Sequence, residues 1–119
     1  METSDNAILK IYASSTDKIG SKLLYEYLVH IAKDNGISGV TVYRGIMGFG
    51  QSSDISSSKF WELTEKLPVV IEIIDTKAAM DKFYKLIEPE LLEMPKGCLV
   101  TMDDIIVRLQ KSGKKKEQL

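Results

Sequence analysis

Cysteine is nearly absent from this chain: Cys98 is the only one among 119 residues. A single cysteine excludes an internal disulfide and a metal site built from several thiolates. Because Cys98 lies in the apolar run CLV, we expect it to be a small buried apolar residue and not a nucleophile.

Long apolar runs and an excess of charge are also missing. No stretch approaches the roughly 20 apolar residues that span a bilayer. The first residues, METSDNAILK, lack the basic start and apolar core of a signal peptide. We therefore expect a cytoplasmic protein without membrane insertion. The net charge of −1 gives no electrostatic reason to bind nucleic acid, so we expect none.

The remaining composition is that of one ordinary globular domain. Hydrophobic residues make up 44% of the chain and charged residues 28%, which is enough apolar material for one core. We expect a single domain over residues 1–110. Residues 111–119, which begin KSGKKK, form a basic tail that we expect to be disordered.

The first half of the chain predicts a strand, a helix and a second strand. Residues 7–13 alternate in polarity as a strand does. Asp17 is a candidate N-cap for a helix whose apolar stripe runs from Ile19 to Ile31. Asn35-Gly36 predicts the end of that helix, and the β-branched run of residues 39–47 predicts the second strand.

The second half predicts a strand, a helix and a fourth strand. Residues 67–75 are rich in Val and Ile, and Asp75 or Thr76 can cap the helix that follows. Pro89 is expected to end or restart that helix. Residues 98–101 predict a short last strand, after which Asp103-Asp104 would form a turn or cap.

The order βαββαβ predicts an α+β fold, the ferredoxin-like sandwich, in which two helices cover one face of a four-stranded antiparallel sheet. The strand over residues 67–75 is apolar on both faces, with only Glu72 interrupting the second face. An apolar face without helices needs another partner, so we expect other subunits to cover it.

The most distinctive segment covers residues 39–58 and reads GVTVYRGIMGFGQSSDISSS. An apolar strand that opens into glycines and then a polar loop can hold a phosphate, because glycine lets backbone N–H groups approach an anion. A β-hairpin with no ligand explains the same pattern equally well.

From about Ile8 to Leu109 the chain resembles the PII signalling superfamily, and most of all a poorly characterised PII-like branch with the phrase RGIxGFG. The resemblance is carried by RGIMGFG, by LPVVIE and by the ending KGCLVTMDDIIVRL. It implies a homotrimer that binds adenine nucleotides in clefts between subunits. It also implies that residues 51–65 form a mobile loop, the T-loop, which engages a partner such as a transporter or a metabolic enzyme.

The resemblance also implies which residues bind the nucleotide. Thr41 matches the position that contacts the adenine side, and Lys96 and Gly97 stand near a second phosphate loop. The base of the long loop, which meets the phosphates, matches Gly48, Phe49, Gly50 and Gln51.

The chain departs from the family pattern at several cationic positions. Gln51 stands where the family has an arginine after GFG, and Val107 and Leu109 stand where basic residues contact phosphate. Each charge-assisted contact is worth roughly 1.5–3 kcal/mol, so fewer cations weaken phosphate binding. We therefore expect AMP, ADP or another adenine nucleotide of low charge in preference to a triphosphate.

Two single residues leave alternatives open. Arg44, in the second strand, could bind a ligand phosphate or carboxylate, or it could pair with Glu72 across the sheet. His30 has no second histidine or nearby cysteine, which makes a metal site there a minor alternative.

As a whole the sequence favours a non-enzymatic regulator. The runner-up is a CutA-type metal-tolerance protein or a small enzyme on the same trimeric scaffold, although no pair of nucleophile and base supports it.

Overall fold

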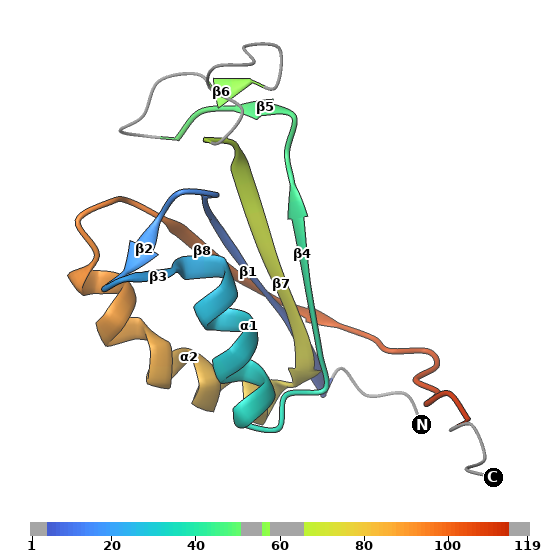
Figure 1. The fold of residues 1–119 in the computed structure, drawn as a ribbon. Coiled ribbons are helices and arrows are strands. Elements are labelled where there is room, and N and C mark those ends of the chain that lie inside the picture. Colours follow the sequence, from blue (N-terminus) through green and yellow to red (C-terminus); the bar gives the residue numbers. More distant parts are fainter. Residues whose placement is uncertain (1–4, 51–55, 58–65, 115–119) are drawn as a thin grey trace, which may run out of the picture.

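The predicted ferredoxin-like α+β fold is confirmed. The computed structural model describes residues 5–50, 56–57 and 66–114. Its main sheet is antiparallel, with strand order β4-β7-β1-β8, and both helices lie on one face of it (Figure 1). The elements are β1 (Asn6–Ser14), β2 (Lys18–Ile19), β3 (Lys22–Leu23), α1 (Leu24–Asp34), β4 (Gly39–Arg44), β5 (Met47–Gly48), β6 (Ser56–Ser57), β7 (Pro68–Thr76), α2 (Lys77–Glu93) and β8 (Leu99–Ile105).

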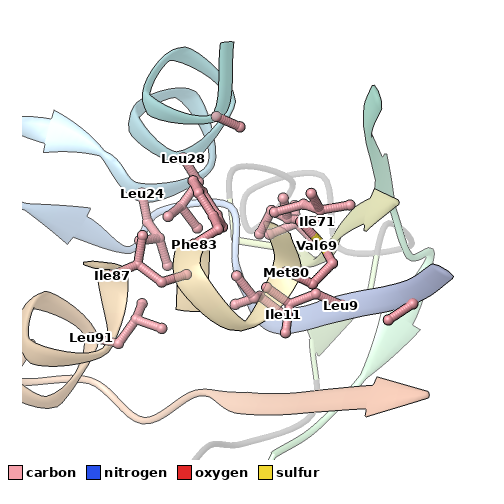
Figure 2. Close-up of a cluster of buried hydrophobic side chains, with 13 residues drawn as sticks. Leu9, Ile11, Leu24, Leu28, Val69, Ile71, Met80, Phe83, Ile87 and Leu91 are labelled. Carbon is pink, nitrogen blue, oxygen red and sulfur yellow. The ribbon is translucent and has the colours of Figure 1, made fainter. Parts of the chain in front are cut away.

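The hydrophobic core fills the space between the sheet and the two helices (Figure 2). Alternation along the two central strands sends every second side chain into it. The helices contribute residues at helical spacing, so that one stripe of each helix faces the sheet. The core residues with the largest side chains are Leu9, Ile11, Leu24, Leu28, Ile71, Ile73, Met80, Phe83 and Ile87.

The other face of the sheet, which we call the open face, carries no helix in the described part of the chain (Figure 1). Strand register arranges its side chains in rows across the four strands. One row is apolar and consists of Tyr43, Val70, Tyr12 and Leu99. The next row is polar and consists of Thr41, Glu72, Lys10 and Thr101. In the third row, Ile74 and Ile8 lie between Gly39 and Asp103.

The segment between β1 and α1 differs from the sequence-based expectation. Asp17 does not cap α1, because residues 18–23 first form the hairpin β2–β3 and the helix begins at Leu24. The turn of this hairpin contains Gly20 with φ of 60°, a conformation that side chains other than glycine rarely adopt. The carboxylate of Asp17 instead accepts a 2.9 Å hydrogen bond from the N–H of Ser14. Asp17 therefore stabilises the corner that follows β1.

The helix ends are mostly as expected. Thr76 caps α2, since its hydroxyl accepts a 3.1 Å hydrogen bond from the N–H of Ala79. Asn35 and Gly36 close α1, and Gly36 has φ of 73°. The expectation for Pro89 was wrong: α2 continues through it to Glu93. Ile87 and Leu91 are buried on either side of the proline, and their packing holds the helix together.

The last strand is longer than predicted. Asp103 and Asp104 do not form a turn or cap but belong to β8, which runs to Ile105. The Asp104 carboxylate lies 3.0 Å from the Lys77 ammonium at the start of α2. Residues 106–114 are exposed and have no regular secondary structure. The division into a domain over residues 1–110 and a tail stays a prediction.

Candidate functional site

The glycine-rich segment forms the base of a hairpin at the end of β4. The predicted strand over residues 39–47 is interrupted after Arg44, where the Gly45 N–H donates a 2.7 Å hydrogen bond to the Pro68 carbonyl. Met47 and Gly48 then pair with Ser57 and Ser56. Figure 1 shows this hairpin, β5–β6, beyond the ends of β4 and β7. Gln51 and most of the loop predicted over residues 51–65 lie outside the described residues.

The glycines at the hairpin base let two segments approach each other closely. A Cβ at Gly45 would lie 2.9 Å from Cγ of Pro68, and one at Gly48 would lie 3.4 Å from the same atom. Neither glycine has a positive φ. Packing against Pro68 therefore explains glycine at position 45 without a ligand, whereas a Cβ at Gly48 would make an ordinary contact with Pro68. Phosphate binding by Gly48, Phe49, Gly50 and Gln51 stays a prediction.

Three large apolar side chains are exposed at the hairpin base. Ile46 is 77% exposed, Met47 58% and Phe49 74%. A soluble protein seldom exposes adjacent apolar groups of this size unless another molecule contacts them. The hairpin base is therefore a candidate contact surface for a ligand, a partner or another copy of the chain.

Thr41 and Arg44 lie on β4, which is an edge strand of the main sheet. Thr41 is exposed on the open face, opposite Glu72 of β7. Arg44 is also exposed but lies opposite Val69, three positions from Glu72, so the two residues point to opposite faces. The ion pair between Arg44 and Glu72, one of the two alternatives for Arg44, is therefore absent, and Arg44 forms no ion pair among the described residues.

Lys96 and Gly97 lie at the opposite edge of the sheet from β4, in the exposed segment just before β8. Both this segment and the hairpin base lie at the same end of the sheet. Leu99 at the start of β8 pairs with Tyr12, which is opposite Val70, and Arg44 at the end of β4 pairs with the adjacent Val69. Two central strands separate the edges β4 and β8, which corresponds to about 14 Å at the usual strand spacing of about 4.8 Å. A single copy thus does not bring all predicted ligand residues together.

Cys98 is exposed next to Lys96 and Gly97, so the expectation of a buried cysteine was wrong. Partial loss of solvent, together with the negative charge of Asp17, raises the pKa of its thiol above the ordinary value. The thiol therefore stays protonated at neutral pH, when it is a weak nucleophile.

The polar row of the open face contains a hydrogen bond between neighbouring strands. The hydroxyl of Tyr43 donates to Oε2 of Glu72 at 2.9 Å. This bond, with smaller contributions from desolvation and from the charge of Glu72, raises the pKa of Tyr43 above its ordinary value. Tyr43 therefore remains a donor at physiological pH and holds the Glu72 carboxylate on the open face.

Two depressions of the described surface are lined by other residues. One, of about 410 Å³, is lined by β3 and α1 and includes Lys22, Tyr27 and His30. The other, of about 190 Å³, lies between the β2–β3 hairpin and the end of α2. In the part of the chain that the structure describes, no three His, Cys, Asp or Glu residues gather as a metal site would require. Neither depression contains a ligand residue predicted from the sequence.

Comparison with known proteins identifies the family. The model of DUF190, described as "Uncharacterized ACR, COG1993", matches residues 6–107. The chain belongs to the DUF190 family. Two relatives are UPF0166 proteins. One, from Aquifex aeolicus, is 34% identical over 100 residues, which is 84% of this chain and 90% of the relative. The other, MJ1524 from Methanocaldococcus jannaschii, is 36% identical over 98 residues, 81% of this chain and 86% of the relative.

Solved structures show that this DUF190 protein has the PII-like fold. CPII from Thiomonas intermedia K12, a nitrogen regulatory PII-like protein bound to ADP, AMP and bicarbonate, superposes with a TM-score of 0.62 at 15% identity, over 86% of this chain and 87% of CPII. A putative PII-like signaling protein from Thermus thermophilus gives a TM-score of 0.61 at 16% identity, over 86% and 88% of the two chains. The PII-like fold implied by the sequence resemblance is confirmed. No helix within the described residues is both long and apolar enough to cross a bilayer.

Several features of this DUF190 site were not predicted from the sequence. The close packing of Gly45 on Pro68 joins segments that are distant in the chain, and no local pattern indicates such a contact. The polar row formed by Thr41, Glu72, Lys10 and Thr101 depends on strand register. Lys10 could have been noticed, because alternation in AILKIYA places it on the face opposite Leu9 and Ile11.

Proposed function

We propose that this DUF190 protein is a PII-like regulator that binds an adenine nucleotide between the subunits of a homotrimer. In this proposal the nucleotide is an effector and not a substrate. Binding changes how residues 51–65 contact a partner protein, for which a transporter or a metabolic enzyme are the candidates.

The observation that carries the proposal is the separation of the predicted ligand residues in one copy. Thr41 and the hairpin base lie at the β4 edge, whereas Lys96 lies before β8 at the other edge. Both groups lie at the same end of the sheet. When copies associate side by side, the β4 edge of one can approach the β8 edge of the next. One small ligand can then contact both groups only at a boundary between copies.

The open face supports self-association. Tyr12 is 39% exposed, Tyr43 45% and Leu99 59%, all in one cross-strand row. Burying apolar surface contributes about 25 cal/mol per Å², so covering this row with another copy is favourable. A trimer places three open faces around one axis and leaves the helices outside.

The chemistry of the site and the solved structures support a nucleotide of low charge. Lys96 and Arg44 are the cations among the predicted ligand residues, and both are exposed. CPII, which has a similar fold, was crystallised with ADP, AMP and bicarbonate. Two cations match the charge of AMP or ADP better than that of a triphosphate. Bicarbonate is a further candidate for the same cleft.

Isothermal titration calorimetry tests the proposal. Wild-type protein is titrated with AMP, ADP, ATP and cyclic AMP, each with and without bicarbonate. We expect saturable binding of AMP or ADP, with ATP weaker. Lys96→Ala should weaken binding by about tenfold or more, since a charge-assisted contact is lost. Lys85→Ala, on the exposed side of α2, is the matched control and should bind as wild type does. Absence of heat with every nucleotide at millimolar concentration would refute the proposal.

The partner contact is proposed to involve residues 51–65 together with the exposed apolar base at Ile46 and Phe49. Affinity capture tests this contact. The wild-type protein and a Phe49→Ser variant are each used as bait, with and without ADP. We expect the captured protein to change with ADP and to be lost with Phe49→Ser. The same captured proteins in all samples would show that this surface is not the contact.

A further inference from the structure

Lys10 occupies an unusual position for a lysine. It lies near the middle of β1, a central strand, and its side chain is half-buried on the open face. Glu72 lies directly opposite Lys10 on β7, yet the two side chains form no ion pair. Among the described residues, the ion pair that forms joins Lys77 and Asp104. The ammonium of Lys10 thus lacks a carboxylate partner among the described residues of a single copy.

Glu72 is already held by another group. Tyr43, on the far side of Glu72 from Lys10, donates its hydroxyl to Oε2 at 2.9 Å. Thr41 lies opposite Glu72 on that same side. The hydrogen bond from Tyr43 directs the Glu72 carboxylate toward β4 and away from Lys10. The second carboxylate oxygen, Oε1, accepts no hydrogen bond from the described residues.

Apolar side chains of the two central strands lie on both sides of this polar row. Tyr12 and Val70 lie on one side of it in the central strands, and Ile8 and Ile74 lie on the other side. Rows on one face of a strand are two residues apart, or about 7 Å. If a second copy covers the open face, a shift of one row would bury the Lys10 ammonium against apolar side chains. An unpaired buried charge is strongly unfavourable, so such a shift is disfavoured.

We propose that Lys10 of one copy pairs with the Glu72 carboxylate of a neighbouring copy, and that this pair fixes the register in which open faces associate. The inference rests on the proposed self-association and adds its specificity determinant. The described open face carries one cation, Lys10, and two carboxylates, Glu72 and Asp103, so two copies are complementary in charge. Glu72 is the better partner for Lys10, because it lies on a central strand whereas Asp103 lies on an edge strand. Buried polar pairs fix register in the same way in other assemblies.

Charge reversal at each position tests the pair. Native mass spectrometry and analytical ultracentrifugation are applied to Lys10→Glu, to Glu72→Lys and to the double variant. We expect each single variant to dissociate, with the dissociation constant raised about tenfold or more, because like charges meet between copies. The double variant should assemble as wild type does. Lys85→Glu, a reversal on the exposed side of α2, should leave assembly unchanged.

Mixing the two single variants separates contacts between copies from contacts within one copy. Each single reversal also places like charges opposite each other within one chain. The resulting loss of stability within one copy is measured by thermal melting followed by circular dichroism. Mixing cannot relieve that repulsion, but it restores opposite charges between unlike copies. We expect mixed trimers of two masses, in which two of the three contacts join unlike copies, at concentrations where each variant alone is dissociated.

The outcomes distinguish this inference from the proposed function. If the wild-type protein is a monomer at every concentration, the proposed self-association is wrong and the inference fails with it. If the wild type assembles and both single variants assemble equally well, only the role of Lys10 and Glu72 is refuted. If the single variants assemble but lose AMP and ADP binding, Lys10 faces the ligand instead, which also overturns the inference.

Discussion

A Cβ atom added to Gly45 would lie 2.9 Å from Cγ of Pro68, while the Gly45 N–H donates a 2.7 Å hydrogen bond to the Pro68 carbonyl. The two residues are held together by this bond and by the absence of a side chain at position 45. The contact sets where the chain leaves β4 and where it enters β7. It therefore positions the β5–β6 hairpin and the segment proposed to contact a partner.

The first prediction concerns Gly45→Ala. The added methyl group must displace Pro68, and such overpacking costs about 1–3 kcal/mol of unfolding free energy. Gly48→Ala is the matched control, because its Cβ would lie 3.4 Å from Pro68 and the change should be smaller. Urea denaturation measures both. Combining Gly45→Ala with Pro68→Ala should recover part of the lost unfolding free energy, because the smaller side chain makes room for the added methyl group. If the effects of the two substitutions on unfolding free energy are fully additive, the contact is contradicted.

The second prediction concerns the contact between the two helices. The Tyr27 hydroxyl donates to the Glu90 carboxylate, 2.8 Å from Oε1 and 2.6 Å from Oε2. Because the pair is only partly buried, Tyr27→Phe should lower the unfolding free energy by about 0.5–1.5 kcal/mol. Tyr25→Phe, on the same helix, is the control and should change it less. Equal effects of the two variants would show that the bond contributes nothing specific.

The same bond makes stability depend on alkaline pH. The hydrogen bond to Glu90, followed by desolvation and the charge of Glu90, raises the pKa of Tyr27. A pKa raised in the folded state stabilises the protonated form. This contribution is therefore complete below the unfolded tyrosine pKa of about 10 and is lost as pH rises through the higher folded value. Thermal melts from pH 8 to pH 11 should show wild type and Tyr27→Phe converging, and parallel curves would contradict this.

The third prediction concerns Pro89 in the interior of α2. Proline supplies no N–H for a helical hydrogen bond, and its ring crowds the carbonyl of Lys85. Pro89→Ala should raise the unfolding free energy by about 1–3 kcal/mol. Part of this gain is offset, because alanine leaves the unfolded chain more conformational entropy than proline does. Lys85→Ala, on the exposed side of the same helix, is the control for loss of a side chain; chemical denaturation measures both. A loss of stability in Pro89→Ala would show that the proline shapes the helix in a way that alanine cannot replace.

The fold was predictable from sequence because its elements are marked by local patterns. Period-two alternation in β1 and β7 and the Thr76 cap of α2 are each readable within a few residues. Local patterns failed where tertiary packing decides. The hairpin β2–β3 replaces a predicted first helical turn, and the buried neighbours Ile87 and Leu91 carry α2 past Pro89.

The candidate site was less predictable, because its parts come from distant segments. The resemblance gave Thr41, Lys96 and the glycine-rich base, but sequence alone does not show that they lie at opposite edges of the sheet. The sequence left Arg44 with two alternatives, a ligand anion or an ion pair with Glu72, because a cation among apolar strand residues needs a partner. The register instead places Arg44 opposite Val69 and leaves Glu72 to Tyr43.

The central claim is that a nucleotide binds only where two copies of the chain meet. Native mass spectrometry of the wild-type protein, titrated with ADP and AMP, tests it most directly, because it reports the number of chains and of bound nucleotides in each species. We predict a species of three chains that carries up to three nucleotides, and monomers that carry none. Nucleotide bound to monomers, or trimers that bind none at millimolar concentration, would contradict the account.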